Sequence, residues 1–346
     1  MESLAVRLRE RRDLGDAEWL EMLESDDPGL AEELHRQARE VARERFGNGI
    51  YLRALIEWSN VCRNNCLYCG IRRDNRSVER YTLSPEEILS CCEQAHRLGL
   101  RTFVLQGGEQ PAAALGLVPV VAEIRASWPD SAITLSLGEL PRETYAAFRR
   151  SGADRYLLRH ETASAAHYAR LHPPQMRLEN RLSCLRTLRE LGFQTGMGMM
   201  VGSPYQGLHD LLADLRLIGS FRPEMIGVGP FIPQRDTPLG SFPPGNPALV
   251  LKLYSMLRLM LPDALIPSTT ALSTLHPQGK LSGILAGANV LMPVFTPPRK
   301  RGAYALYDGK PAAERDGAEQ LMTLQQQLAA AGYQPSMDRG DHAEHR

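Results

Sequence analysis

The chain has 346 residues, and its 40 Lys and Arg residues balance 40 Asp and Glu residues, so the formal net charge is zero. A neutral chain without a long basic run argues against a general nucleic-acid binder and against binding to an anionic membrane surface. Hydrophobic residues make up 43% of the chain, which is enough for a large core and excludes wholesale disorder. The length suits two domains or one large α/β barrel.

No segment has the pattern of a signal peptide or a membrane span. The first residues lead into an Arg- and Glu-rich amphipathic stretch. The longest apolar stretch, 249–261, contains Lys252 and Arg258 and is too short to cross a bilayer. Three of the six cysteines fall between residues 62 and 69, whereas a disulfide framework would spread them. The pattern therefore favours reduced thiols, a metal site and a cytoplasmic location.

In chain order, helices come first and an alternation of strands and helices follows. Residues 1–48 are expected to form N-terminal helices, at 16–23 and 28–46. Short apolar runs then alternate with amphipathic segments, as in a parallel α/β sheet. Expected strands cover 52–59, 102–106, 132–136, 155–159, 194–201, 225–228, 265–267 and 289–292. Expected helices cover 84–98, 112–128, 141–151, 178–191, 207–219, 247–261, 273–286 and 318–331.

This order predicts a complete (β/α)8 barrel over residues 49–311. A closing helix is expected within 312–333, and the polar residues 334–346 are expected to be a disordered tail. Such barrels carry their chemistry at the carboxyl ends of the strands. The polar and glycine residues expected at that end include Asn60, Gly107, Gly108, Glu109, Ser136, Arg159, Glu161, Gly229 and Ser268.

Three cysteines directly follow the first expected barrel strand, as Cys62-Arg-Asn-Asn-Cys66-Leu-Tyr-Cys69. A structural zinc site needs four ligands, and residues 70–89 contain neither Cys nor His. Three thiolates instead leave one iron of a 4Fe-4S cluster open to an external ligand. We therefore interpret the three cysteines as cluster ligands, with zinc as the alternative.

The spacing Cys-x3-Cys-x-aromatic-Cys, with Tyr68 as the aromatic residue, resembles the radical S-adenosylmethionine (SAM) superfamily. The resemblance implies that the open iron binds the amino and carboxylate groups of SAM. It also implies that one electron from the reduced cluster yields methionine and a 5′-deoxyadenosyl radical. The run Gly107-Gly108-Glu109 resembles the superfamily's GGE element, which holds the methionine amino group. Glycines let the backbone approach a ligand closely, and a carboxylate accepts hydrogen bonds from an ammonium group.

Longer strings resemble the HydE family of FeFe-hydrogenase maturases, from about residue 45 to residue 310. They include 59–75, 196–202, 227–233, 236–239, 267–271 and 287–290. The resemblance implies that Glu161 and Arg181 hold SAM and that Met200 and Val228 contact its adenine. The alternative for Met200 and Val228 is ordinary barrel core. Ser136 is assigned to the same cofactor site.

A substrate cavity is expected across the barrel from the cluster. Thr134 lies on the same strand face as Ser136 by the alternation of side chains. The other substrate residues, placed by the matching family segments, are Arg159, Thr269, Thr270, Tyr304 and Tyr307. Hydroxyl, guanidinium and phenol groups suit a small anionic ligand. The resemblance implies an organometallic substrate, an iron complex with carbon monoxide, cyanide and a cysteine-derived ligand. It also implies a ferredoxin- or flavodoxin-type reductant and other hydrogenase maturases as partners.

The sequence departs from the family pattern at three places. No cysteine follows Cys184, so only one cluster is expected. Gln110 stands where Asp usually follows the GGE element. The turn that begins at Gly202 reads Gly-Ser-Pro-Tyr where the family has Gly-Leu-Pro-Gly. The last two departures leave room for a paralogue with another substrate.

The remaining cysteines and the histidines are given smaller roles. Cys91, Cys92 and Cys184 fall within expected helices and are interpreted as structural. His160 is placed to reach the barrel mouth. The histidines expected at the surface are His167, His172, His342 and His345.

Three other functions remain open at this point. Methylornithine synthase is a radical SAM enzyme with one cluster, and its cavity must also bind a zwitterion. Biotin synthase requires further cysteines on barrel strands, but here the spare cysteines fall on expected helices. A non-catalytic iron-sulfur scaffold would have no need of the GGE element or of the pair Glu161 and Arg181. Spectra of the reduced cluster with and without SAM distinguish an enzyme from a scaffold.

Overall fold

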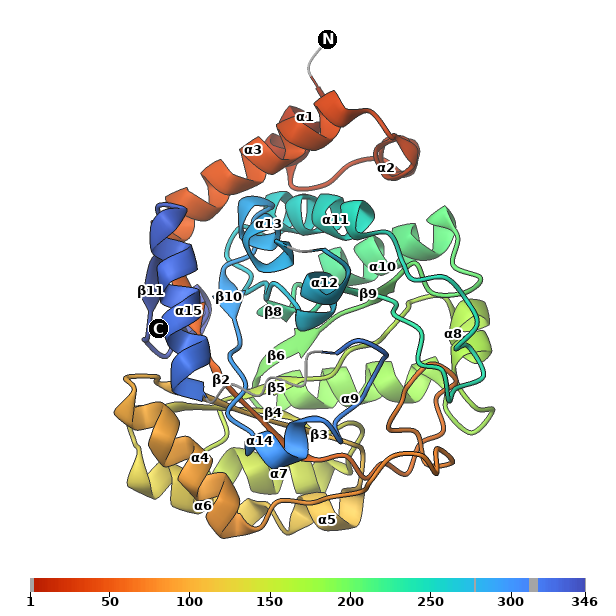
Figure 1. Ribbon diagram of the computed structural model, residues 1–346. Helices are drawn as coiled ribbons and strands as arrows, with labels where there is room; N and C mark the ends of the chain where they lie inside the picture. The colour runs from red at the N-terminus through yellow and green to blue at the C-terminus, as the bar shows by residue number, and fades with distance from the viewer. Residues whose placement is uncertain (1–2, 277, 311–316, 346) are drawn as a thin grey trace.

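The computed structural model describes residues 3–276, 278–310 and 317–345. At the N-terminus, α1 (Leu4–Arg11), α2 (Asp16–Glu24) and α3 (Pro28–Phe46) lie across one side of the molecule, over α11 (Pro247–Met260) and α10 (Leu208–Phe221) (Figure 1). Asp27 caps α3 by accepting from the N–H groups of Gly29 and Leu30, and Pro28 occupies its first turn. The expected helix 28–46 is confirmed, and α1 was not predicted.

Six parallel strands form the central sheet. Their order is the order of the chain: β2 (Ala54–Ser59), β3 (Thr102–Gly107), β4 (Ala132–Ser136), β5 (Arg155–Leu157), β6 (Gln194–Met197) and β8 (Met225–Ile226). Two short strands, β7 (Met200–Val201) and β9 (Gly229–Pro230), pair with each other just beyond β6 and β8. The expected α/β class with a parallel sheet is confirmed.

The remaining strands lie between the two ends of this sheet. β1 (Gly49–Leu52) pairs in parallel with β10 (Val290–Leu291) and with β11 (Gln334–Ser336). Isolated parallel bridges join Met225 to Leu265, Pro267 to Val290 and Leu55 to Val294. The expected strand 265–267 is thus present only as single bridges.

Helices surround the sheet (Figure 1). They are α4 (Pro85–Arg97), α5 (Pro111–Leu115), α6 (Val118–Ser127), α7 (Arg142–Arg150), α8 (Ala165–Leu171), α9 (Leu178–Glu190), α12 (Thr270–Leu275), α13 (Gly279–Leu285), α14 (Pro298–Arg301) and α15 (Gly317–Ala330), with α10 and α11. The expected helix 112–128 is divided, because Pro119 fits the first turn of α6 and not a helix interior. The expected helix 273–286 is divided as well. It begins earlier than predicted, where Thr269 caps α12.

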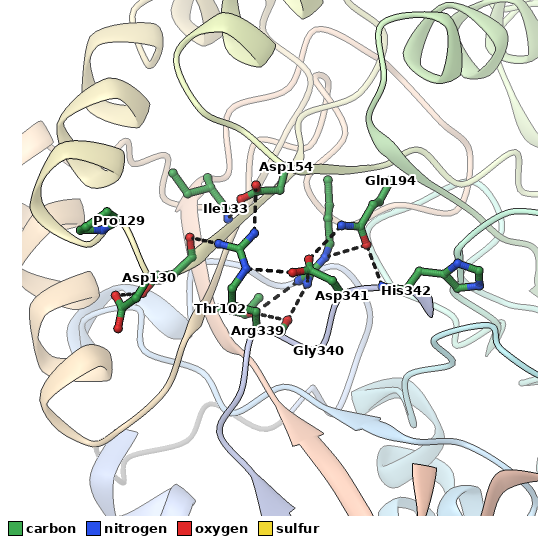
Figure 2. Close-up of polar contacts among 12 residues, drawn as sticks. Thr102, Pro129, Asp130, Ile133, Asp154, Gln194, Arg339, Gly340, Asp341 and His342 are labelled. Atoms are coloured by element: carbon green, nitrogen blue, oxygen red, sulfur yellow. Dashed lines mark hydrogen bonds and ion pairs between the residues drawn. The ribbon is translucent and has the colours of Figure 1, made fainter. Parts of the chain in front are cut away.

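The prediction of a disordered tail at 334–346 is wrong for the described residues. β11 pairs with β1 in the register Gly49–Gln334 and Tyr51–Ser336, and Ala343–His345 form a 3-10 helix. Arg339 and Asp341 lie in a network of polar contacts with Asp154 and Gln194 (Figure 2). Polar composition suggested solvent exposure, but these groups pair with buried polar groups at the amino ends of the strands. Residues 312–316 of the expected closing segment lie outside the described residues.

In the described part of the chain, none of the helices combines the length and the apolar character needed to traverse a lipid bilayer.

Candidate active site

A cavity of about 290 Å³ lies at the carboxyl ends of the strands. It is lined by residues from the cysteine loop, from β3, β4, β5, β7 and β9, and from residues 304–307. The predicted site residues that line it are Tyr68, Cys69, Gly107, Ser136, Arg159, Glu161, Arg181, Met200, Tyr304 and Tyr307. Strand-end placement therefore brings most of the predicted cofactor and substrate residues around one cavity.

The loop after β2 carries the three cysteines, and their thiols are free and half-buried or more. The Glu109 N–H donates to Cys62 Sγ over 3.4 Å, and the Cys66 thiol lies 3.8 Å from Met176 Sδ. Burial raises the pKa of the Cys66 thiol well above its usual value, and the neighbouring thiols of Cys69 and Cys62 raise it further. Burial likewise raises the pKa of Cys69, to about 12. Three thiols that influence one another in this way are close together in a site poor in water.

Gly107 and Gly108 pack directly against the cysteine loop. A Cβ on Gly107 would meet the Trp58 indole, and a Cβ on Gly108 would meet the carbonyl of Val61 and the Cβ of Cys62. The Gly108 N–H donates to the Ser59 carbonyl over 2.9 Å. Only glycine fits at these two positions, so the GGE run fixes the end of β3 against the cysteines.

Glu109 is buried behind this contact and both carboxylate oxygens have partners. Arg63 Nε donates to Oε1 over 2.9 Å, and the Glu139 N–H donates to Oε2 over 2.8 Å. Gly138 lies so close that a Cβ there would collide with the Glu109 carboxylate. Gln110 Nε2 donates to Ser59 Oγ and to the Val61 carbonyl. Gln110, which departs from the family pattern, therefore connects the end of β3 to the end of β2 and to the start of the cysteine loop.

Residues 303–310 close the cavity on the side of the cysteine loop. The Gly70 N–H donates to the Leu306 carbonyl over 2.8 Å, and a Cβ on Gly70 would collide with the Ala305 carbonyl. Asn60 Nδ2 donates to the Ala303 carbonyl over 2.7 Å. These contacts place Tyr304 and Tyr307 beside Cys69 in the cavity wall.

Arg159 and Glu161 form an ion pair in the cavity wall. Arg159 donates from one nitrogen to Glu161 Oε2 and to the Met199 carbonyl, each over 2.9 Å. Arg159 Nε is buried and has no hydrogen-bond partner among the described residues. Glu161 has φ +68°, a left-handed conformation that costs a non-glycine residue about 1–2 kcal/mol. Strain of this kind concentrates at functional sites.

Arg181 reaches the cavity from α9, where it forms an ion pair with Glu139. Arg181 Nε and Glu139 Oε1 are 2.9 Å apart. The geometry is not that of a hydrogen bond, since both atoms, like the Tyr168 hydroxyl, are buried without a hydrogen-bond partner in the described structure. Burial raises the pKa of Glu139, and Arg181 opposes that shift. This corner of the cavity therefore holds polar groups that a ligand with hydrogen-bond donors and acceptors would satisfy.

Several predicted site residues do not line the cavity. Val228 is fully buried in the main core, which supports the alternative interpretation of this residue. Thr269 Oγ1 accepts the N–H of Leu272 as the cap of α12, and the Thr270 carbonyl accepts from Thr274. Thr134 lies one layer below Ser136, and its buried hydroxyl has no hydrogen-bond partner in the part of the chain that the structure describes. Cys62, Cys66, Gly108 and Glu109 do not line the cavity either, but Glu109 packs against the lining residue Gly138.

The prediction that four histidines lie at the surface is wrong for three of them. His167, His172 and His342 are buried, at 3%, 2% and 9% exposure. Burial lowers the pKa of His172 to about 3, so the ring is neutral. It stacks on Tyr168 and lies 3.3 Å from the Tyr68 hydroxyl. Spacing in the sequence gave no signal for these contacts. Cys91 and Cys92 are buried in α4 and Cys184 is half-buried in α9, as expected for structural residues.

Sequence reasoning missed Gln106 and the buried pair Glu57 and Lys310. Gln106 lines the cavity and donates to the Tyr304 hydroxyl over 3.3 Å. Glu57 is its register partner on β2, and Lys310 Nζ lies 2.5 Å from Glu57 Oε1 and 2.9 Å from the Tyr304 carbonyl. Burial raises the pKa of Glu57 and lowers that of Lys310. The inward alternation along β2 and β3 was the signal that could have identified Glu57 and Gln106.

The donors around the cysteine loop fit an iron-sulfur cluster. Thiols are the ligands of such clusters, and an N–H···S contact such as that from Glu109 is one of the features that set a cluster's potential. Gly108 lets the backbone at the end of β3 pack directly against Val61 and Cys62 of the loop. Among the residues that the structure describes, no three His, Cys, Asp or Glu side chains are placed to share a single metal ion.

The chain is similar in sequence and in fold to known proteins. The pattern of the radical SAM superfamily matches residues 56–218. The [FeFe] hydrogenase maturase subunit HydE of Thermotoga maritima is 43% identical over 332 residues, which cover 96% of this chain and 94% of that protein. The chain belongs to the HydE family. The HydE-family resemblance is thus confirmed, and the protein is a radical SAM enzyme.

Other relatives of this HydE-family chain are more distant. The 3-methylornithine synthase of Methanosarcina barkeri is 28% identical, over 97% of this chain and 94% of its own. The crystal structure of methylornithine synthase (PylB) superposes with a TM-score of 0.84 at 26% identity, covering 96% of this chain and 97% of that one. HydG, a maturase of the [FeFe]-hydrogenase, superposes at 0.79 with 22% identity over 96% and 75%, which shows the shared fold alone.

Proposed function

We propose that this protein acts in assembly of the FeFe-hydrogenase active-site cluster, on a small anionic or organometallic substrate bound in the cavity. The observation that carries the proposal is the cavity wall itself. Cys69 stands on one side, and Arg159, Tyr304 and Tyr307 stand around the same space. A guanidinium and phenols around a half-enclosed cavity recognise a small anion by charge and by directional hydrogen bonds.

Cys62, Cys66 and Cys69 would hold a single 4Fe-4S cluster, since no cysteine follows Cys184 and the other three lie in helices. SAM would be held by the lining residues Tyr68, Gly107, Ser136, Glu161, Arg181 and Met200, together with Gly108 and Glu109. When bound, the cluster and SAM supply one-electron reductive cleavage of a sulfonium. Arg181, which pairs with Glu139 and whose Nε lacks a hydrogen-bond partner among the described residues, would orient an oxygen of the ligand, and the Glu109 carboxylate would attract its ammonium group.

The partners and the full barrel also belong to this proposal. A ferredoxin- or flavodoxin-type reductant and other hydrogenase maturases would act with the protein, and neither nucleic acid nor a membrane would take part. Six free cysteines agree with a reducing, cytoplasmic setting. The isolated bridges from Met225 to Leu265, Pro267 to Val290 and Leu55 to Val294 support closure of the sheet into a complete (β/α)8 barrel.

Glu109→Ala is expected to weaken SAM binding by about 10- to 100-fold, because a buried ammonium would lose a charged acceptor. Equilibrium dialysis of SAM against cluster-loaded protein measures the change, with iron content checked in the same sample. Glu123→Ala, which removes an exposed glutamate from α6, is the matched control. Unchanged affinity in Glu109→Ala at full iron content would remove Glu109 from the cofactor site.

Arg159→Ala is expected to lower support of hydrogenase maturation by about 10- to 100-fold, because a charged anion contact is lost. Cleavage of SAM should stay within about twofold of wild type, since Arg159 is assigned neither to the cluster nor to SAM. A maturation mixture and 5′-deoxyadenosine release are measured on the same variant. Arg159 also contacts Glu161, so Arg159→Lys is the control that keeps the positive charge.

Full maturation by Arg159→Ala would refute the substrate site. Loss of both activities would assign Arg159 to the cofactor site. The second candidate function, that of methylornithine synthase, is favoured by the 0.84 TM-score at almost full coverage of both chains. A maturation mixture that does not need this protein, together with 3-methylornithine formation in its presence, would decide for that candidate.

A further inference from the structure

A buried carboxylate on α10 contacts the cavity wall from behind. Asp214 and His160 are both 0% exposed, and His160 Nε2 lies 2.9 Å from Asp214 Oδ1. The same Oδ1 accepts the N–H of Ala163 over 2.6 Å. Asp214 lies on the helix face that also buries Leu211, Leu215 and Ile218. A carboxylate in such a place costs several kcal/mol unless its partners compensate it, so its presence needs a reason.

The two residues that contact Asp214 lie on either side of Glu161, the strained residue of the cavity wall. His160 precedes Glu161, and Ala163 follows it by two positions, so one oxygen atom ties down both sides. The Glu161 backbone is also held, because its N–H donates to the Gly198 carbonyl and its carbonyl accepts from the Met200 N–H. A left-handed φ of +68° persists only where the surroundings impose it. The surroundings here are β6, β7 and the Asp214 carboxylate.

The orientation of Glu161 decides what the cavity presents to a ligand. With this backbone conformation the Glu161 carboxylate faces the cavity and pairs with Arg159. Relaxation of Glu161 to the ordinary right-handed or extended regions would turn the side chain away from that position. The titratable groups that face Asp214 are His160 and, at longer range, His167. Neither side chain of the Asp214–His160 pair lines the cavity.

We propose that Asp214 and His160 are positioning residues, which hold Glu161 left-handed and thereby aim its carboxylate at the bound cofactor. The inference rests on the proposed function in one respect, the assignment of Glu161 to the SAM site. Asp214 acts through Glu161 alone, so its contribution to SAM binding disappears when the Glu161 carboxylate is absent. A residue that merely stabilises the fold would not depend on Glu161 in this way.

The experiment is a double-mutant cycle on cluster-loaded full-length protein, read by equilibrium dialysis of SAM and by thermal unfolding. Glu161→Gln and Asp214→Ala are each expected to lower SAM affinity about tenfold. The double variant should bind SAM no more weakly than Glu161→Gln alone. Asp214→Asn, whose amide oxygen can still accept from Ala163, should recover part of the affinity. If Asp214→Ala does not fold, His160→Ala replaces it in the cycle, because this change removes only one of the two contacts of Asp214.

The control is Ser255→Ala on α11, a fully buried polar residue that bonds to His35 and to the Ala286 carbonyl. It should lower the unfolding temperature and leave SAM affinity unchanged. Unchanged affinity in Glu161→Gln would overturn the assignment of Glu161, which belongs to the proposed function. Weakened binding in Glu161→Gln with unchanged binding in Asp214→Ala, or additive losses in the double variant, would overturn the positioning role.

Discussion

Replacing Cys66 by alanine is expected to leave the protein without its iron-sulfur cluster and without any cleavage of SAM. The Cys66 thiol is free and partly buried, on the same loop as Cys62 and Cys69. Two remaining thiolates cannot complete the three-cysteine set that leaves one iron open. Alanine supplies no other ligand, and no other cysteine lies in this loop. Cys62→Ala and Cys69→Ala should give the same result.

Iron and sulfide analysis after anaerobic reconstitution measures this expectation, with about four of each per wild-type chain and almost none in the variants. Cys184→Ala and Cys91→Ala are matched controls, because both cysteines lie in helices away from the loop. A wild-type content near eight would contradict the single cluster. Retention of the cluster in Cys66→Ala would contradict the ligand set.

Replacing Asp341 by alanine is expected to lower the free energy of unfolding by about 3–5 kcal/mol, the usual cost of breaking a buried ion pair. Asp341 Oδ1 lies 2.6 Å from a nitrogen of Arg155, whose side chain is 0% exposed. Asp341 also accepts from Gln194 Nε2 over 2.8 Å and from Arg339 Nε over 2.8 Å (Figure 2). Without the carboxylate, the Arg155 guanidinium is left in the interior without its anion.

Chemical denaturation measures the loss for Asp341→Ala, and Asp338→Ala is the control in the same segment. Asp338 is exposed and its carboxylate accepts from the Ser336 hydroxyl, so its removal should change stability by less than about 0.5 kcal/mol. Equal stability of the two variants would show that Arg155 finds another partner and that the segment does not hold the sheet.

The same carboxylate makes stability depend on acid. Burial alone would raise the pKa of Asp341, but Arg155, Arg339 and Gln194 outweigh burial and lower that pKa to about 2. An unfolded chain has an Asp pKa of about 3.9. The depressed pKa therefore contributes stability above pH 4, which is lost as the pH falls towards 2. The stability difference between wild type and Asp341→Ala should shrink over that window.

The sequence predicted the site residues well where they lie at or directly after the end of a strand. Cys69, Gly107, Ser136, Arg159 and Glu161 were placed together because parallel strands deliver their carboxyl ends to one edge. Residue type and local spacing are sufficient for that inference. Whether a side chain faces the cavity or the core is harder to predict, because it depends on the exact alternation of side chains at each strand end. Val228 was assigned to the adenine contact, and it lies in the core.

The tail and the buried histidines could not be predicted for a different reason. Polar residues at the end of a chain usually face water, yet Arg339 and Asp341 pair with charges that come from strands far away in the sequence. His172 is hidden by a ring stack with Tyr168 and a contact to Tyr68. Such partners come together only in the folded protein, and the composition of neither segment predicts them.

The arrangement around β1 has a consequence for synthesis of the chain. β1 lies between β10 and β11, and the hydrogen bond from Arg53 to the Gly340 carbonyl joins residues 287 positions apart. A ribosome therefore makes β1 first and both of its neighbours last. Until residue 340 has emerged, β1 has unpaired edges, which are the surfaces through which nascent strands aggregate. Pairing of β1 with both neighbours is thus a late event in synthesis, and the interval before it is when the chain is most exposed to misassembly.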